Sequence, residues 1–384
     1  MRLIILFLMV AACSRAPEVE LIHLLKNKYA NIEVNEIHKR EVIARLEKLL
    51  RKKSLNKNSE SDVVTLLNEL GDGHIKLEHY SWPVITYESG MVIDFATEEV
   101  LACPTCKPTL KPGRYAISSV DGVALNDWLN SQSLKVAASS SHGRRFRLLN
   151  SLQESTHPFI KTVKIKGSDY ELTWVVKDRF PPCVSGERIN SGLYKITLRN
   201  FWCTEGKNLS RKEMVKNFKM QWDKVIAEVK VDDQVELDLR NNSGGGDEEV
   251  MHVLQTFFSK PVEVFHYQYL AQTQPGIWKK LYQTFPFKRW DSVKVDYLTK
   301  PVEAKVLDNK LQVLVGAGCF SSCEIVAGVL KHEKRAGLIG SKTHGGVGEP
   351  RSYPLGEGYS LMIPICRLWQ KNGELYEGNG VSVE

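Results

Sequence analysis

The sequence lacks the long apolar run of a membrane-spanning helix, the repeated cysteine pairs of a zinc module, and the mixed basic and aromatic helix of a nucleic-acid-binding protein. Its N-terminal apolar run, Leu3 to Ala12, has ten residues, whereas a helix that spans a bilayer needs about 20. The CxxC pair of Cys103 and Cys106 has no second pair and no paired histidines near it, so no zinc site is expected. The net charge of +7 is spread along the chain, which argues against a nucleic-acid partner.

What remains is the composition of an ordinary folded protein. Hydrophobic residues make up 42% and charged residues 25% of the 384 residues, and these values are typical of globular chains. The length is sufficient for two or three domains. The modest positive charge leaves a favourable field toward an anionic membrane surface.

The N-terminal residues predict export and a lipid anchor. Arg2 precedes the apolar run and small residues follow it, as in a secretory signal peptide. Val10-Ala11-Ala12-Cys13 resembles the cleavage signal of bacterial lipoproteins, so we interpret residues 1–13 as a lipoprotein signal peptide. Cys13 then becomes the lipidated first residue, and the mature chain is anchored to a membrane of the bacterial cell envelope. A plain secreted protein cleaved elsewhere is the alternative, and a buried N-terminal helix is disfavoured because the run has no amphipathic period.

The cysteines fit an exported protein, because export permits disulfides. Cys103 and Cys106 are predicted to form a local disulfide, since their surroundings do not offer the thioredoxin-like unit of a redox motif. Cys183 and Cys203 are a second candidate pair. If Cys13 is lipidated, seven of the eight cysteines remain, and an odd number leaves at least one free thiol.

Three regions follow a short tether. Helical spacing of apolar residues predicts an N-terminal helical region over 18–75. Its helices are expected from Glu18 to about Ile32 and from Glu36 to about Lys53, and the last one ends at Gly71. Residues 80–180 are rich in β-type segments with irregular connections. Residues 190–384 alternate strands and helices, and Ser210 to Glu213 form a capping box at the start of one helix. The expected fold class is α/β, or mixed α+β: a helical cap, a β-rich middle region and a ββα-type C-terminal domain.

One stretch of the C-terminal domain has the layout of an exposed nucleophile. A short apolar run, Val313 to Gly316, reads as a buried strand, and a turn of small residues leads from it to Ser321 and Ser322. A helical apolar stripe follows. Such a turn lifts a serine hydroxyl out of a sheet, and the helix N-terminus supplies free N–H groups for a developing oxyanion. The alternative is that these serines only cap the helix. The free thiol expected above is then Cys319 or Cys323, beside the serines.

A second stretch lies upstream and has the same kind of layout. Val235 to Leu239 alternates like a strand and leads directly into Arg240-Asn-Asn-Ser-Gly-Gly-Gly246, after which a helix begins near Asp247. Three glycines at a strand-to-helix turn let the backbone approach a ligand closely and point N–H groups at it. A flexible turn is the simpler interpretation.

Together and in this order, the two stretches resemble the tail-specific (C-terminal processing) and tricorn-core family of serine proteases. The family's DLRxNxGG loop matches Asp238 to Gly245, and its S-x-x-E-I helix start matches Ser321 to Ile325. The resemblance implies a ClpP/crotonase-like protease domain in which Ser321 is the nucleophile. It also implies that the backbone N–H groups of Gly244 and Ser322 form the oxyanion hole.

The resemblance offers two kinds of catalytic base. One version of the family uses a lysine in a turn after the nucleophile helix, but Gly346 occupies that place here. The tricorn-like version uses a histidine in a helix-end turn, which matches His74 in Gly71-Asp-Gly-His74. The serine that precedes this histidine in tricorn is replaced by Gly73. His344 is the runner-up base, and Lys342 is interpreted as a solvated turn residue.

The tricorn-like version also uses a distant glutamate. The chain's end, Glu377-Gly-Asn-Gly-Val381, resembles the family's E-G-x-G-V tail, so Glu377 is the candidate that supports the site. Glu374 is interpreted as a surface hairpin residue.

Two further segments are less clear. Tyr115 to Gly122 with Trp128 resembles part of a PDZ-type module, so the middle region is either a degenerate PDZ-like domain or a β extension of the protease domain. Residues 262–306 are long and rich in aromatic residues. This segment either lines the substrate cleft or is a stabilising insertion.

The sequence therefore predicts a serine endopeptidase that acts on polypeptides through an acyl-enzyme, with no cofactor and no metal. Ser321 would attack a carbonyl carbon while His74 takes its proton. A catalytically inactive lipoprotein of the same fold that binds a peptide or a lipid is the rival interpretation, and an esterase or acyl-transferase is a third. The sequence does not define the substrate or the oligomeric state.

Overall fold

The computed structural model describes residues 16–79, 86–156, 158, 160–177, 180–204, 209–269, 295–298 and 306–384. The predicted signal peptide with Cys13, and most of the aromatic segment 262–306, lie outside these residues. Within them, none of the helices combines the length and the apolar character that crossing a membrane requires.

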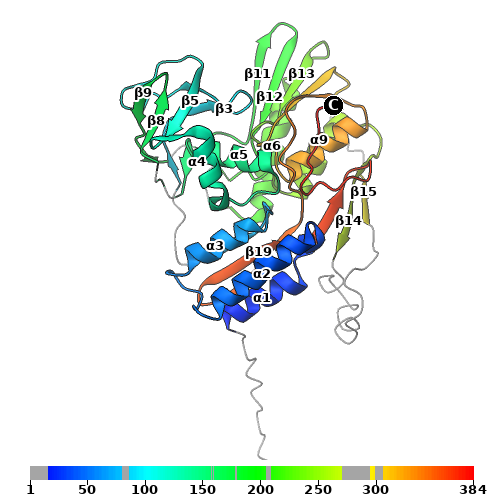
Figure 1. The fold of residues 1–384 in the computed structure, drawn as a ribbon. Helices are drawn as coiled ribbons and strands as arrows, with labels where there is room; N and C mark the ends of the chain where they lie inside the picture. The colour runs from blue at the N-terminus through cyan, green and yellow to red at the C-terminus, as the bar shows by residue number, and fades with distance from the viewer. Residues whose placement is uncertain are drawn as a thin grey trace, which may run out of the picture.

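The N-terminal region is helical and packs on a hairpin from the far end of the chain (Figure 1). Its helices lie against the antiparallel sheet β1-β19-β18. Leu24, Leu46 and Leu361 are fully buried in their shared core. The elements are α1 (Pro17–Asn27), the 3₁₀ helix η1 (Ala30–Glu33), α2 (Glu36–Leu50), α3 (Glu60–Glu69), β1 (Lys76–His79), β18 (Pro350–Gly356) and β19 (Tyr359–Pro364). The sequence interval between helix α3 and strand β1 is thereby fixed beside the C-terminal domain.

Two predicted helix boundaries needed correction. The helix expected to run from 18 to about 32 ends at Asn27, and a separate 3₁₀ turn follows. The break has a physical reason, because it lets Tyr29 and Asn31 turn their side chains onto the buried carboxylate of Asp72. The helix expected to end near Lys53 ends at Leu50. Gly71 ends the last helix with φ of +65°, as predicted.

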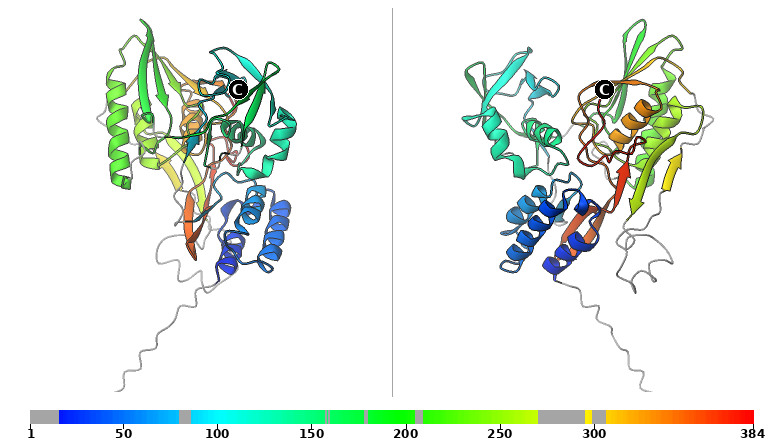
Figure 2. Two further views of the ribbon diagram at one scale, coloured as in Figure 1. Left: turned by 90° about the vertical axis from the view of Figure 1, so that its left-hand side faces the viewer. Right: turned by 45° about the vertical axis from the view of Figure 1, so that its right-hand side comes forward.

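The middle region has its own core and its own sheets (Figure 2). The larger sheet has the order β3-β4-β5-β8-β9, with β6 added beside β5, and all its pairs are antiparallel. A small sheet, β10-β2-β7, lies beside it. The interpretation of this region as PDZ-like stays a prediction. Its elements are β2 (Tyr87–Glu88), β3 (Val92–Asp94), β4 (Glu99–Ala102), β5 (Tyr115–Val120), β6 (Val123–Ala124), α4 (Leu125–Ser131), η2 (Ser133–Lys135), α5 (Ser141–Asn150), β7 (Glu154–Ser155), β8 (Thr162–Ile165), β9 (Ser168–Glu171) and β10 (Val175–Val176).

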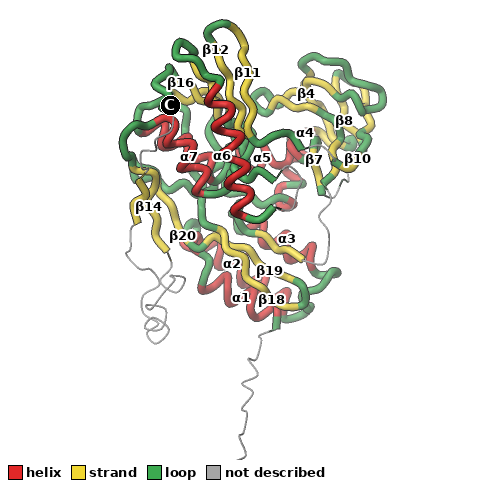
Figure 3. The backbone as a smooth tube through the Cα atoms, turned by 180° about the vertical axis from the view of Figure 1, so that it is seen from behind, coloured by secondary structure: helices red, strands yellow, loops and turns green. Residues whose placement is uncertain are grey.

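The C-terminal domain is built on a five-stranded sheet of order β11-β12-β13-β16-β17. Strands β12 to β17 of this sheet are parallel, and β11 is antiparallel to β12. Helices α6 and α7 lie side by side behind it (Figure 3), and α7 also contacts α9. The elements are β11 (Val184–Asn190), β12 (Leu193–Leu198), α6 (Arg211–Ala227), β13 (Gln234–Asp238), α7 (Asp247–Phe257), β16 (Leu311–Val315), α9 (Ser322–His332) and β17 (Gly337–Gly340). A second sheet, β15-β14-β20, joins β15 (Val295–Leu298), β14 (Glu263–Tyr269) and β20 (Cys366–Trp369).

Local sequence explains why these elements form. The capping box predicted at Ser210 is present and starts α6. Helix α9 is buried on every side from Ser322 to Leu330, as expected of a helix that is apolar all round. Strands β13 and β16 are parallel neighbours, with Leu237 opposite Val313. Because parallel strands end at the same edge of a sheet, the turn after β13 and the turn after β16 meet there.

Candidate active site

The glycine loop after β13 and the serine turn after β16 are in direct contact. The Phe320 N–H donates to the Asn242 carbonyl at 3.0 Å. Gly244 has φ of +89°, and a Cβ placed on it would lie 2.8 Å from the Ser321 Cβ and 2.7 Å from the Phe320 carbonyl oxygen. Only glycine fits so close to the serine, which explains the loop composition that the sequence analysis singled out.

Ser321 stands at the start of helix α9 in a conformation that serine rarely adopts. Its φ is +58° and its ψ is −122°, and a non-glycine residue held there stores strain of about 1–3 kcal/mol. The surrounding structure holds it, because its N–H donates to the Gly346 carbonyl at 3.0 Å and lies 3.2 Å from the Glu324 carboxylate. The turn therefore presents the hydroxyl outward rather than using it as a simple helix cap.

His74 lies directly against this hydroxyl. Its Nε2 is 3.1 Å from the Ser321 Oγ, although the two residues are 247 positions apart. The His74 ring stacks on Phe320 with centroids 4.5 Å apart, and its backbone N–H donates to Asp72 at 2.9 Å. The structure thus brings together the two side chains on which the sequence-based hypothesis depends. Their chemical roles remain predictions.

Burial keeps His74 neutral. The pKa of its imidazole is lowered to about 4, chiefly because burial disfavours the charged form; the Asp72 charge raises this pKa and the Arg147 charge lowers it. A neutral ring whose Nε2 faces a hydroxyl can accept a proton from it.

Behind the ring lie two buried carboxyl groups. One ligand atom each of Asp72, His74 and Glu377 lies within 4.8 Å of the other two. The His74 Nδ1 is buried and has no hydrogen-bond partner within the described residues. Both Glu377 oxygens are buried as well, and Ser139 is the side chain whose hydrogen bonding lowers the pKa of Glu377. Burial and then the Asp72 charge raise the pKa of Glu377 well above its usual range, while Lys39 opposes this shift. Glu377 thus lies close to His74, and its role in supporting the site stays a prediction.

Among the described residues this is the one cluster of histidine, cysteine or carboxylate side chains close enough to hold a metal ion. Two nearby cations work against that use. Lys39 is 3% exposed and donates to the Tyr29 hydroxyl and the Asn31 carbonyl, and the half-buried Arg147 lowers the pKa of His74. Lys39 and Arg147 thus already supply positive charge near these carboxyl groups.

Sequence reasoning missed the residues that support His74. The Asp72 carboxylate accepts from the Tyr29 hydroxyl and from the Asn31 amide, both at 3.0 Å. The Ser139 hydroxyl accepts from the Gly73 N–H at 2.9 Å, so it lies beside the position where tricorn has its additional serine. Asp72 is two residues before His74, and this spacing was the one local signal that could have identified it.

The alternative bases are placed less favourably. A Cβ at Gly346 would lie 2.5 Å from the Phe320 ring and 2.6 Å from the Ser139 hydroxyl, so the position of the family lysine cannot hold a side chain. Lys342 is exposed, as interpreted from the sequence. The His344 Nδ1 lies 3.0 Å from the Ala317 carbonyl oxygen, and burial strongly lowers the pKa of its ring. Its hydrogen bond is thus directed away from the serine.

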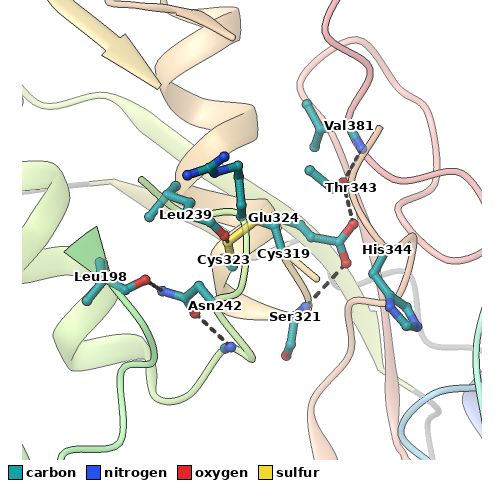
Figure 4. The surroundings of a disulfide bond; sticks show 12 residues. Leu198, Leu239, Asn242, Cys319, Ser321, Cys323, Glu324, Thr343, His344 and Val381 are labelled. Carbon is teal, nitrogen blue, oxygen red and sulfur yellow. Dashed lines mark hydrogen bonds between the residues drawn. A yellow bond between two sulfur atoms is a disulfide. The ribbon is translucent and has the colours of Figure 1, made fainter. Parts of the chain in front are cut away.

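Glu324 ties the serine turn to the chain's last loop (Figure 4). Its buried carboxylate accepts from the Thr343 hydroxyl at 2.6 Å and from the N–H groups of Gly345 and Gly346 at 2.7 and 2.8 Å. Burial raises its pKa to about 7, against the effect of these donors. Thr343 in turn accepts from the Val381 N–H at 2.7 Å.

The two predicted oxyanion donors differ. The Ser322 N–H has no acceptor within the described part of the chain, as a helix N-terminus allows. The Gly244 N–H donates to the Asn242 side chain at 2.8 Å, and that side chain donates to the Leu198 carbonyl at 3.0 Å. Gly244 could therefore reach an oxyanion only by sharing or giving up this bond. Both roles remain predictions.

A cavity of about 930 Å³ opens in front of the pair. Its wall beside the serine is apolar, formed by Ile325, Val347 and Leu368. The half-exposed Trp202 and the charged residues Arg211, Asp247, Glu248 and Glu349 also line it. A cavity of this size accommodates an extended segment of polypeptide.

The cysteine predictions were partly wrong. The predicted pairs Cys103–Cys106 and Cys183–Cys203 are disulfides. Cys319 and Cys323, expected to include a free thiol, are bonded to each other. Within the described residues the free thiol is the buried Cys366, on strand β20. The turn at Ser321 explains the error, because it brings the Cα atoms on either side of the serine to 5.3 Å.

A buried imidazole on a serine hydroxyl, at a strand-to-helix turn that opens into a cleft, is the arrangement of a serine hydrolase. Residues 196–383 match the sequence model of peptidase family S41, and this part of the chain belongs to that family of serine-type peptidases. Ser321 and the glycine loop lie inside the matched range, and His74 lies outside it.

Individual relatives agree with this assignment. The chloroplastic carboxyl-terminal-processing peptidase 2 of Arabidopsis thaliana is 30% identical over 131 residues, which cover 34% of this chain and 21% of that protein. The match thus spans about a fifth of this curated relative. Two solved structures share the fold over nearly the whole chain: mature CPAF complexed with lactacystin (TM-score 0.71, 13% identity, 95% of this chain and 92% of that chain) and the photosystem II D1 C-terminal processing protease (TM-score 0.55, 16% identity, 96% and 91%).

Proposed function

We propose that this protein is a serine endopeptidase of the carboxyl-terminal-processing type, in which Ser321 is the nucleophile and His74 the base. The contact between the His74 Nε2 and the Ser321 Oγ, at 3.1 Å, is the single observation that carries the proposal. The family lysine has no room at Gly346. A histidine base is therefore favoured over a Ser-Lys dyad.

The reaction follows from these positions. Ser321 attacks the carbonyl carbon of a peptide bond while His74 takes the hydroxyl proton, and the Ser322 N–H stabilises the negative charge that develops on the carbonyl oxygen. The protonated His74 then gives its proton to the leaving amine, which breaks the C–N bond and leaves an acyl-enzyme. A water molecule then attacks the acyl-enzyme while His74 takes its proton. The acyl group is released, and His74 returns the proton to Ser321.

In this mechanism Asp72 and Glu377 support the imidazolium. Among the described residues the His74 Nδ1 has no hydrogen-bond partner, and one ring nitrogen of His74 lies within 4.8 Å of a carboxyl oxygen of each of these two buried residues. A carboxylate behind the ring favours the protonated imidazole that forms during the reaction. We assign this charge to Asp72, which Tyr29 and Asn31 hold in place. Glu377, whose raised pKa favours the neutral form, is assigned a supporting role beside it.

The substrate we propose is a polypeptide, and the site of action is the bacterial cell envelope. Three disulfides in the described residues are compatible with an oxidising compartment, and Cys13 follows a signal-like sequence. Expression of the full chain and of Cys13→Ala, followed by membrane fractionation and mass spectrometry, tests the anchor. Loss of lipid and of membrane association in Cys13→Ala alone is expected; an unlipidated wild type would overturn this part.

Labelling with a fluorophosphonate probe tests the nucleophile. We expect wild-type protein to be labelled on Ser321, Ser321→Ala not to be labelled, and the matched control Ser322→Ala to be labelled at the same residue as wild type. Equal labelling of wild type and Ser321→Ala would remove Ser321 from the proposed role. Binding of peptides without turnover, unchanged by His74→Ala, would instead support an inactive binding lipoprotein. Turnover of esters but not peptides would support an esterase.

A further inference from the structure

A disulfide closes a ring around the candidate nucleophile. Cys319 lies two residues before Ser321 and Cys323 two residues after it, and their sulfur atoms are bonded (Figure 4). Both cysteines are fully buried. The ring joins the turn that follows strand β16 to the first turn of helix α9, so it spans the backbone of Ser321 and the Ser322 N–H.

The other restraints on this turn are not covalent: one is the Glu324 carboxylate in the same segment, and the others come from other segments. The Phe320 N–H donates to the Asn242 carbonyl, and the Ser321 N–H donates to the Gly346 carbonyl, each at 3.0 Å. Both partners belong to loops that could move away from the turn. The disulfide is independent of those loops, because it connects residues on the two sides of Ser321.

Ser321 needs such a restraint because of its backbone conformation. With φ of +58° it lies in a region that serine leaves readily when nothing holds it. Relaxation to a helical or extended conformation would turn the Oγ away from the His74 Nε2. It would also turn the Ser322 N–H away from the place of the oxyanion. A displacement of about 1 Å can reduce the rate ~100-fold.

We propose that the Cys319–Cys323 disulfide is a positioning element that keeps Ser321 in its reactive conformation, so that the activity of this site depends on the disulfide being oxidised. The proposal rests on the role of Ser321 given above. It assigns to the two cysteines no contact with substrate. It also predicts that the enzyme loses activity in a compartment that reduces this bond.

The chemistry of the switch is ordinary thiol–disulfide exchange. One thiolate of a dithiol reductant attacks one sulfur and breaks the S–S bond, which forms a mixed disulfide. The second thiolate of the reductant releases the protein thiol. The two electrons and two protons end on Cys319 and Cys323, and the reductant leaves as a cyclic disulfide. Because both sulfurs are buried, the reaction requires the turn to open first.

The chain contains a matched control. Cys103–Cys106 is also a local disulfide, with three rather than four residues of separation and the same Cα distance of 5.3 Å. Both of its cysteines are buried in the core of the middle region. They contribute nothing to the wall of the cavity in front of Ser321.

The test compares Cys319→Ser/Cys323→Ser with Cys103→Ser/Cys106→Ser. We expect the first double variant to react with a fluorophosphonate probe at Ser321 roughly 10- to 100-fold more slowly than wild type, and the second within about twofold. The acid limb of the rate against pH, which His74 sets, should stay where it is in wild type. Circular dichroism and thermal melting check that both variants fold.

A second measurement uses a variant in which Cys319 and Cys323 are unchanged. Reduction of Cys103→Ser/Cys106→Ser by dithiothreitol, followed by mass-spectrometric assignment of the new thiols, should slow labelling in proportion to the reduced Cys319–Cys323 pair, and reoxidation should restore it. Cys319→Ser/Cys323→Ser should not respond to the reductant.

Full-speed labelling of Ser321 in the reduced protein, or in a folded Cys319→Ser/Cys323→Ser variant, would overturn the proposal. A shift of the acid limb large enough to account for the whole loss of rate would also overturn it, because it would show that the surroundings of His74 had collapsed. Absence of labelling in the oxidised wild type would refute the proposed function instead, so the two failures are distinguishable.

Discussion

The nucleophile and the base of the candidate pair are held in different ways. Ser321 sits in a turn fixed by its neighbours in sequence: a disulfide across it and the carboxylate of Glu324 three residues later. His74 sits in a turn fixed by distant side chains, since Asp72 is bound by Tyr29 and Asn31, 41 to 43 residues earlier. The turn that carries Ser321 is therefore a local motif, whereas the position of His74 depends on the packing of the N-terminal helices.

The buried carboxyl group near Ser321 and the one near His74 also have different surroundings. Glu324 accepts hydrogen bonds from Thr343 and from two backbone N–H groups, and its pKa is raised to about 7. Within the described residues Glu377 accepts no backbone hydrogen bond, and burial and the Asp72 charge raise its pKa well above its usual range, against the effects of Lys39 and Ser139. Glu324 is thus a structural acceptor, whereas Glu377 is a poorly satisfied buried group beside an imidazole. Poorly satisfied buried groups are candidates for a functional role.

Removing the base should have the largest effect. We predict that His74→Ala lowers the rate of peptide hydrolysis by about 10²–10⁴-fold, because a positioned general base contributes that much. The rate of fluorophosphonate labelling should fall with it. His344→Ala is the control for a nearby buried histidine whose Nδ1 faces the Ala317 carbonyl. If His344→Ala lost more activity than His74→Ala at equal folded fraction, the assignment of the base would be reversed.

The pH dependence of the labelling rate should report on the same residue, His74. Because burial lowers the pKa of His74 to about 4, the labelling rate should stay level from neutral pH to about pH 5. It should fall about tenfold per unit below pH 4, since only the neutral ring accepts the proton. An acid limb near pH 6.5, the ordinary value for histidine, would mean that the ring is solvated in solution. Circular dichroism at each pH separates titration from unfolding.

The nucleophile side was largely predictable from sequence, and the base side was not. Ser321 and the glycine loop were found because each is a strand, a turn and a helix in consecutive residues. A histidine in a glycine-rich turn carried little information until the resemblance to the protease family was considered. The support of His74 by Tyr29 depends on where helix α1 ends, and the apolar spacing extended that helix too far.

The error over Cys319 and Cys323 has a related cause. Two cysteines four residues apart suggest a disulfide only if the backbone between them is known. Here the positive φ of Ser321 brings their Cα atoms to 5.3 Å. A strained residue at a functional site is what local sequence rules fail to predict. The alternation of strands and helices in the C-terminal domain followed from patterns that those rules describe well.

Two buried groups of the site, His74 and Glu324, should have opposing effects on the pH dependence of folding stability. His74 has a lowered pKa, so the unfolded state binds more protons between about pH 4 and 6.5, and stability rises with pH there. Glu324 has a raised pKa, so the folded state binds more protons between about pH 4.5 and 7, and stability falls as pH rises. The two slopes partly cancel between pH 4.5 and 6.5.

The variant Glu324→Gln should separate the effects of the His74 and Glu324 titrations. The amide cannot accept on both arms, so at least one of the N–H donors of Gly345, Gly346 and Ser321 loses its acceptor, and the free energy of unfolding should fall by about 1–3 kcal/mol. Stability should then rise more steeply with pH between 4.5 and 6.5 than in wild type, because the opposing titration is gone. Urea unfolding at several pH values measures both effects. An unchanged slope would show that Glu324 does not titrate in this range.

The smallest effect is expected for Glu377→Gln. Burial and Asp72 favour the neutral form of Glu377, and glutamine has nearly the same shape without a charge, so the free energy of unfolding should change by less than about 1 kcal/mol. The rate should fall only several-fold if the Asp72 carboxylate stabilises the imidazolium, and Asp72→Asn should then cost more than Glu377→Gln. The reverse order, with a loss near that of His74→Ala, would make Glu377 the charged partner of the imidazole, and both sides of the site would then depend on an ionised glutamate.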